Sequence, residues 1–95
     1  MTFYTRHQVV ELLRIEEGFL ERLEQEEVVE VDAPESAEGV FSERMLERAR
    51  VADTLVRDLD VNLGGVAIIV RMREEIAELH HALGTALQTL RSERG

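Results

Sequence analysis

The chain has 95 residues, with 20 acidic and 11 basic side chains, a net charge of −9 and no cysteine. We expect a single domain with at most a helical extension, because this length leaves no room for a separate catalytic domain. The lack of cysteine excludes a disulfide framework and thiolate metal sites. The longest apolar run, Val66 to Val70, is far too short to span a membrane. The start of the chain lacks the pattern of a signal peptide, so we expect a soluble, cytoplasmic protein.

The negative charge is concentrated in one segment of the chain. Residues 11–38 hold 11 acidic side chains against Arg14 and Arg22, and this imbalance equals the whole net charge. A surface of this kind repels nucleic-acid phosphates and favours cationic partners.

Two short helices are predicted at the start of the chain. The first begins at Thr5, because Gln8 follows at the spacing of a capping box. Its apolar stripe is formed by Val9, Val10, Leu12 and Leu13. After a break at Arg14, a second helical pattern runs from about Glu16 to Gln25. Its apolar arc is formed by Ile15, Phe19, Leu20 and Leu23. Two short helices with a tight joint indicate a helix-turn-helix.

A small β wing is predicted after the second helix. The β-branched run Val28–Val31 is typical of a strand, and Gly39-Val40-Phe41 can pair back with it as a second strand. Ser42 is a suitable N-cap for a third helix, and apolar residues keep helical spacing from there to Leu59.

A fourth helix, capped by Asn62, is predicted to run almost to the C-terminus. It carries a heptad seam formed by Ile69, Met72, Ile76, Leu79, Leu83, Ala86 and Leu90. Its length of roughly 45 Å is too great for a 60-residue head to cover, so we expect a homodimer through this seam. The alternative is that the seam packs back on the head of its own chain.

The order of these elements resembles that of the MerR-type winged helix-turn-helix proteins. In that group a leucine, an apolar step, a capping residue and another leucine lead into the long helix. Leu59, Val61, Asn62 and Leu63 match this turn. The resemblance implies a mainly α-helical fold with a small β wing, made of a winged helix-turn-helix head over residues 1–60 and a dimerisation helix over residues 61–95.

Within that superfamily the sequence is most similar to the chaperone modulators of the CbpM type. The matching segments are Val40-Phe41, Arg48-Ala49, Gly65-Val66-Ala67 and Ile76-Ala77-Glu78-Leu79. The chain departs from the wider pattern at Arg14 and Glu27, where the group commonly has glycine, the residue favoured at positive φ. The resemblance implies binding to the J-domain of a DnaJ/CbpA-like co-chaperone, whose second helix is typically basic, and inhibition of its action with Hsp70.

The second helix lacks the side chains of a DNA reader. Its outward face is predicted to carry Glu17, Glu21, Glu24 and Gln25. The three carboxylates of this face repel DNA phosphates and attract a basic helix, so we predict that this face is the partner-binding surface. Two alternatives stay open. The acidic face can be an ordinary solvated surface, or the protein can be a MerR-type transcription regulator that contacts DNA through arginines of the third helix, namely Arg44, Arg48, Arg50 or Arg57.

We predict neither an enzyme nor a metal or cofactor site. The sequence has no glycine-rich phosphate loop and no activated cysteine. Glu78 and His81 share a helix face at a spacing used in di-metal bundles, but such sites need further carboxylates from facing helices.

Overall fold

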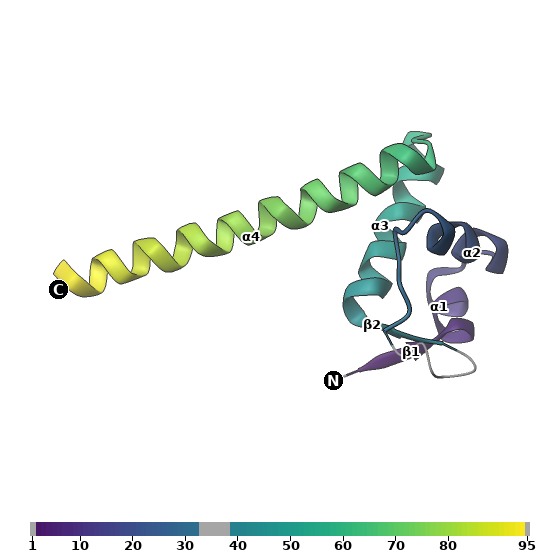
Figure 1. Cartoon of the computed structure of the whole chain (residues 1–95), viewed down its shortest axis with the longest axis horizontal. Helices are drawn as coiled ribbons and strands as arrows, with labels where there is room; N and C mark the ends of the chain where they lie inside the picture. Colours follow the sequence, from purple (N-terminus) through teal and green to yellow (C-terminus); the bar gives the residue numbers. More distant parts are fainter. Residues whose placement is uncertain (1, 33–38, 95) are drawn as a thin grey trace.

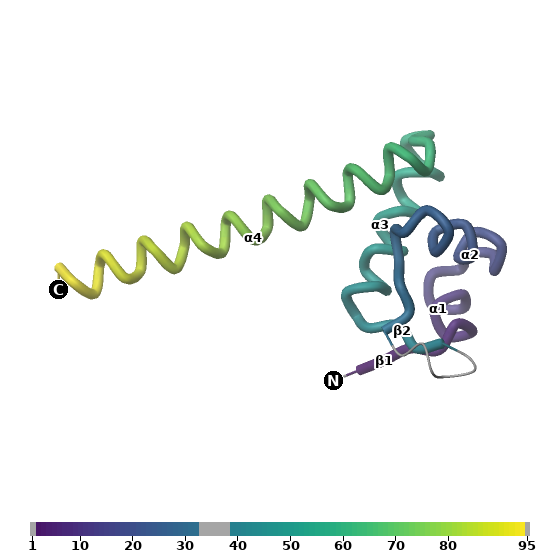
Figure 2. The backbone as a smooth tube through the Cα atoms, in the orientation of Figure 1, coloured from purple at the N-terminus to yellow at the C-terminus, as the bar shows by residue number. Residues whose placement is uncertain are grey.

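The computed structural model describes residues 2–32 and 39–94. The elements follow in the order β1 (Phe3–Thr5), α1 (Arg6–Leu13), α2 (Glu17–Gln25), β2 (Val40–Ser42), α3 (Glu43–Leu59) and α4 (Leu63–Arg94). The first three helices and the two strands form a head, and α4 extends from it as a single long rod (Figure 1). The backbone tube shows that only the first turns of α4 lie near the head (Figure 2).

The predicted helix-turn-helix is confirmed in α1 and α2. The Gln8 amide donates to the Thr5 hydroxyl at 3.1 Å, and the Thr5 amide donates to the Gln8 side chain at 2.9 Å, which completes the capping box. Arg14 ends α1 with φ +55°, and Glu27 follows α2 with φ +58°. Both residues therefore adopt the left-handed conformation for which glycine is favoured, even though neither is glycine.

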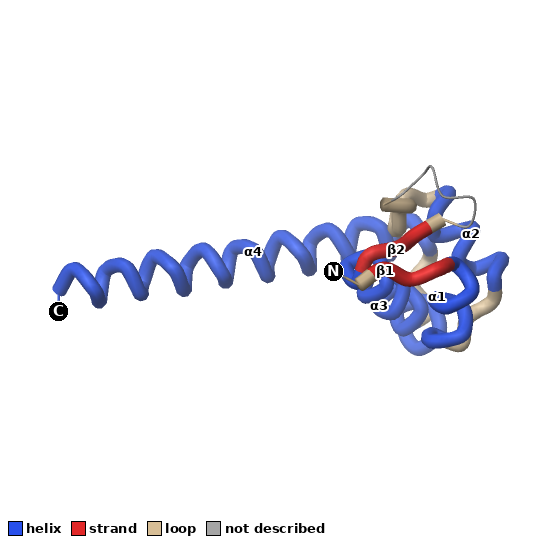
Figure 3. Tube along the Cα trace, turned by 90° about the horizontal axis from the view of Figure 1, so that it is seen from below, coloured by secondary structure: helices blue, strands red, loops and turns tan. Residues whose placement is uncertain are grey.

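The predicted wing is wrong in its pairing. β2 pairs antiparallel with β1, with Tyr4 opposite Phe41, and not with a strand at residues 28–31 (Figure 3). The β-branched run forms no strand because its backbone is used elsewhere. The amides of Val28 and Val29 donate to the Leu23 carbonyl at the end of α2, at 2.8 and 3.4 Å. One trace of the predicted hairpin remains, since the Asp32 amide donates to the Val40 carbonyl at 2.9 Å. Residues 33–38, which lie between the two predicted strands of the wing, are outside the described residues.

The core of the head lies between α1, α2, α3 and the start of α4. Within the described residues its buried apolar side chains are Val9, Ile15, Phe19, Leu20, Leu23, Val28, Val29, Phe41, Met45, Ala49, Ala52, Val66 and Val70. The predicted apolar stripe of the first helix is only partly confirmed, because Leu12 is exposed. The predicted arc of the second helix is confirmed. The apolar face of α3 is confirmed at Met45, Ala49 and Ala52 but not at its end, because Leu59 is exposed.

The start of α4 is capped by its own turn and is fixed to the head by ion pairs with α3. The Asn62 side chain accepts from the Gly65 amide at 2.8 Å, which confirms the predicted cap. More than two helical turns further on, Glu74 accepts from Arg48 at 3.2 Å and forms an ion pair with Arg44 at 3.0 Å. Every described residue of α4 after Glu74 is exposed.

Replacing Glu74 by glutamine is expected to lower the free energy of unfolding by about 1 kcal/mol, because the variant loses charged hydrogen bonds that join α3 to α4. Urea unfolding at a fixed protein concentration measures the loss. Glu75→Gln is the matched control, since Glu75 is an exposed neighbour on the same helix, and we expect it to change stability by less than about 0.5 kcal/mol.

The same cluster predicts a pH dependence. Hydrogen bonds from Arg48, followed by those from Arg44, hold the pKa of Glu74 below its ordinary value of 4.5. A lowered carboxyl pKa stabilises the fold above the pKa of the unfolded chain, and this stabilisation is lost as the pH falls through the folded value. Acidification below about pH 4.5 should therefore destabilise the wild type more than Glu74→Gln. Equal acid sensitivity of the two proteins would contradict the role of Glu74.

Candidate functional site

The exposed face of α2 carries most of the predicted partner-binding residues. Phe19, Leu20 and Leu23 are buried against the core, which turns the opposite side of the helix to solvent. Glu17, Glu21 and Gln25 are exposed on that side, whereas Glu24 is half-buried. The structure thus places Glu17 and Glu21 at adjacent turns of one acidic face.

Glu24 differs from the other residues of this face because it is already paired. Both of its carboxylate oxygens accept from the guanidinium of Arg6 at the start of α1, one of them at 3.1 Å. The hydrogen bonds to Glu24 raise the pKa of Arg6, and the charges of Glu24, Glu21 and Glu17 add to this effect. Glu24 therefore joins α2 to α1 and is less available to a partner than Glu17 and Glu21.

Arg6 is a residue of the site that the sequence pattern does not indicate. Its guanidinium also lies over the Phe41 ring, 5.6 Å from the ring centre. Arg6, Glu21, Glu24 and Gln25 together line an open depression beside α2. The depression is thus rimmed by carboxylates, with one cation that Glu24 already binds.

The arginines of α3, on which the DNA-binding alternative depends, are all bound to acidic side chains. Arg44 and Arg48 contact Glu74. Arg50 donates to Glu47 at 2.9 Å. Arg57 forms an ion pair with Asp53 at 3.1 Å and also donates to the backbone carbonyl of Arg14 at 3.4 Å. Contacts to DNA phosphates would have to compete with these carboxylates.

The predicted seam of α4 is a continuous exposed apolar face. Its large side chains have exposed fractions from 36% at Ile69 to 68% at Leu79. The seam does not pack back on the head, because of α4 only Val66 and Val70, at its start, are buried. Two further exposed apolar side chains, Ile68 and Leu87, flank the seam. Leu87 follows Leu83 at helical spacing, so the sequence did contain a signal for it.

Across residues 2–32 and 39–94, no three histidine or acidic side chains lie together in a way that could hold a metal ion. His80 and His81 are exposed on α4. No helix in the described part of the chain combines the length and the apolar character needed to cross a bilayer.

Comparison with protein families identifies a match over most of the chain. The sequence model of a family described as MerR HTH family regulatory protein matches residues 4–88. This range begins at β1 and ends near the C-terminal end of α4, so it includes both the head and most of the long helix. No curated protein matches the chain.

Proposed function

The chain belongs to the MerR HTH family of regulatory proteins, and on that premise we propose that it regulates by binding another protein. We propose a chaperone modulator of the CbpM type, which binds the J-domain of a DnaJ/CbpA-like co-chaperone and inhibits its action with Hsp70. The protein acts by occupancy and not by catalysis.

The acidic face of α2 is the observation that carries this proposal. In a helix-turn-helix that reads DNA, the outward side of the second helix presents groups that bind base edges and phosphates. Here Glu17 and Glu21 are exposed on that side. Two carboxylates that no described residue pairs with suit a cationic helix in this position and oppose a polyanion.

The mechanism follows from this charge. Glu17 and Glu21 pair with arginine and lysine side chains on the basic helix of the J-domain, which is the surface that Hsp70 needs. Glu24 contributes mainly by holding α2 against α1 through Arg6. Exposed ion pairs contribute only about 0–1 kcal/mol each, so the carboxylates set the association rate and the specificity more than the affinity.

A homodimer through α4 is part of the same proposal. The exposed seam, which includes Ile76, Leu79 and Leu83, is a larger apolar surface than a monomer usually leaves in water. Its heptad spacing suits a second copy of the same helix. Each dimer would then present two acidic faces, one on each head.

The DNA-binding alternative has weaker support. Each of the four arginines of α3 that it could use is bound to a carboxylate of α3 or α4, and α2 offers acidic groups in the place of basic ones. Phosphate binding would therefore have to break existing ion pairs next to a surface that is negatively charged and repels phosphates.

Isothermal titration of the purified protein with the isolated J-domain of a DnaJ-like protein from the same genome tests the proposal. We expect a Kd of about 1 μM or tighter at low salt, and clear weakening at physiological salt because the charges are exposed. A gel-shift assay on genomic DNA fragments at low salt is the parallel control. Retarded DNA together with no J-domain binding at either salt would favour the transcription regulator.

A further inference from the structure

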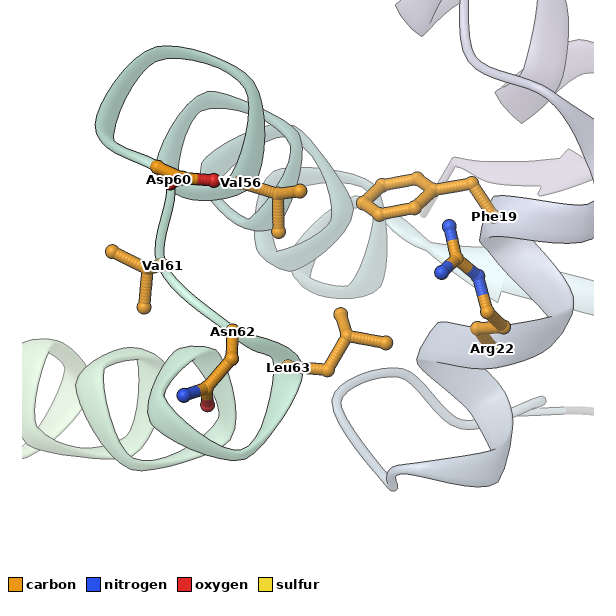
Figure 4. Close-up of a pocket in the computed structure, with 7 residues that line it drawn as sticks. All are labelled: Phe19, Arg22, Val56, Asp60, Val61, Asn62 and Leu63. Carbon is orange, nitrogen blue, oxygen red and sulfur yellow. The ribbon is translucent and has the colours of Figure 1, made fainter.

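A groove lies beside α2, on the side away from Arg6. It is open to solvent and has a volume of about 420 Å³. Phe19 and Arg22 of α2, Val56 of α3, and the turn residues Asp60, Val61, Asn62 and Leu63 line it. In Figure 4 the side chains of Phe19, Val56 and Leu63 point into the space between α2 and the turn that joins α3 to α4. The groove therefore has an apolar floor with polar groups at its rim.

The groove is continuous with the acidic face of α2. At 3.6 residues per turn, the strip formed by Gly18 and Arg22 lies between the strip of Glu17 and Glu21 and the side of Phe19. The Arg22 guanidinium lies over the Phe19 ring, 5.6 Å from its centre. An element that crosses α2 from the carboxylates to the groove must therefore pass over Gly18 or Arg22, and Gly18 has no side chain in its way.

Gly18 is exposed, and the fold of the chain itself does not explain it. A Cβ atom built at this position meets nothing within 4 Å, and the residue does not have a positive φ. Gly18 is the second residue of α2, and glycine loses more conformational freedom on folding than any other residue. Such a glycine is useful where the backbone of another molecule must approach closely.

We infer that a helix of the protein partner crosses α2 over Gly18, with its cations at Glu17 and Glu21 and one large apolar side chain in the groove. This inference rests on the proposed function and adds the contact that supplies affinity. Charge complementarity selects a basic helix as the occupant, because the groove adjoins the exposed carboxylates. Ion pairs of this kind are individually weak, and a buried apolar anchor next to them is the usual source of binding energy.

The test replaces Gly18 by glutamine and titrates the full-length variant with the isolated J-domain. Glutamine is uncharged and favourable in helices, so the variant should be at least as stable to heat as the wild type. Its long side chain should block the path to the groove and weaken binding at least tenfold. Gly84→Gln is the matched control, because Gly84 is also an exposed helical glycine with open space around it, on the distant part of α4. We expect it to bind the J-domain like the wild type.

The outcomes separate this inference from the proposed function. If Gly18→Gln binds like the wild type while charge reversal at Glu17 and Glu21 prevents binding, the crossing over Gly18 is wrong and the acidic site stands. If the wild type itself does not bind the J-domain, both fail. If Gly18→Gln lowers self-association in sedimentation and leaves J-domain binding unchanged, a second copy occupies the groove and the inference is overturned.

Discussion

Reversing the charges of Glu17 and Glu21 together is expected to weaken J-domain binding about 30- to 100-fold at low salt. Each exposed ion pair contributes about 0–1 kcal/mol, and a lysine in its place adds repulsion of similar size. The double variant should therefore lose about 2–3 kcal/mol of binding free energy. The variant leaves Glu24 and its pair with Arg6 intact, so the contact between α1 and α2 is kept. Isothermal titration at two salt concentrations measures the effect.

The control carries the same change in charge at another place. Glu75 and Glu78 are exposed acidic residues of α4, far along the chain from α2. Their double replacement by lysine changes the net charge of the protein equally, so it corrects for general electrostatic steering. We expect less than a threefold change for this control. Unchanged affinity of the folded Glu17→Lys/Glu21→Lys variant would move the partner site away from α2.

The helices could be predicted because their signals are local. The capping box of Thr5 and Gln8 spans four residues, and the caps Ser42 and Asn62 stand directly before the helices that they begin. The apolar spacing in each helix is also read within a few turns. These signals give the order and type of the helices with little dependence on tertiary contacts.

The sheet could not be predicted in the same way, because its two strands are far apart in the chain. Tyr4 pairs with Phe41, and no local pattern links residues 3–5 to residues 40–42. The run Val28–Val31 contains residues with high β propensity, but that propensity mainly reflects how side chains fit a buried surface. Val28 and Val29 are indeed buried, in the core of the head and without a strand.

The same limit applies to the candidate site. The sequence pattern placed Glu17, Glu21 and Glu24 on one helix face, but it could not show that Arg6 neutralises Glu24. Glu74 likewise meets Arg44 and Arg48 only because α4 crosses α3. Ion pairs between side chains on different helices can be identified only from the tertiary structure. This pairing is what distinguishes Glu17 and Glu21 from Glu24, which lies on the same helix.

The rod formed by α4 depends on a partner more than any other element does. Its 32 residues span about 48 Å, and only its first turns contact the head. An isolated helix is marginally stable in water, even when its sequence favours helix formation. The part of α4 beyond Glu74 therefore needs another apolar surface to remain helical. A second copy of the seam, as we propose, would supply such a surface.

Replacing Leu79 and Leu83 by glutamate should therefore convert a dimer into a monomer. The two side chains lie near the middle of the seam, with exposed fractions of 68% and 61% in the single chain. Burying four unpaired carboxylates in a dimer costs about 4 kcal/mol or more, which is at least about 1000-fold in the dimer dissociation constant. Sedimentation equilibrium at micromolar concentration measures the change. Far-UV circular dichroism should also show a loss of helix, because the freed end of α4 unfolds in part.

Thr85→Glu/Gln88→Glu is the matched control for this variant. Both positions are exposed and lie on the side of α4 away from Leu83, so two added carboxylates there remain in water. The control should sediment as a dimer and keep the helix content of the wild type. A wild type that sediments as a monomer, or a Leu79→Glu/Leu83→Glu variant that remains a dimer, would show that the seam has another occupant. J-domain binding by the monomeric variant then tests whether one acidic face suffices, since Glu17 and Glu21 belong to a single head.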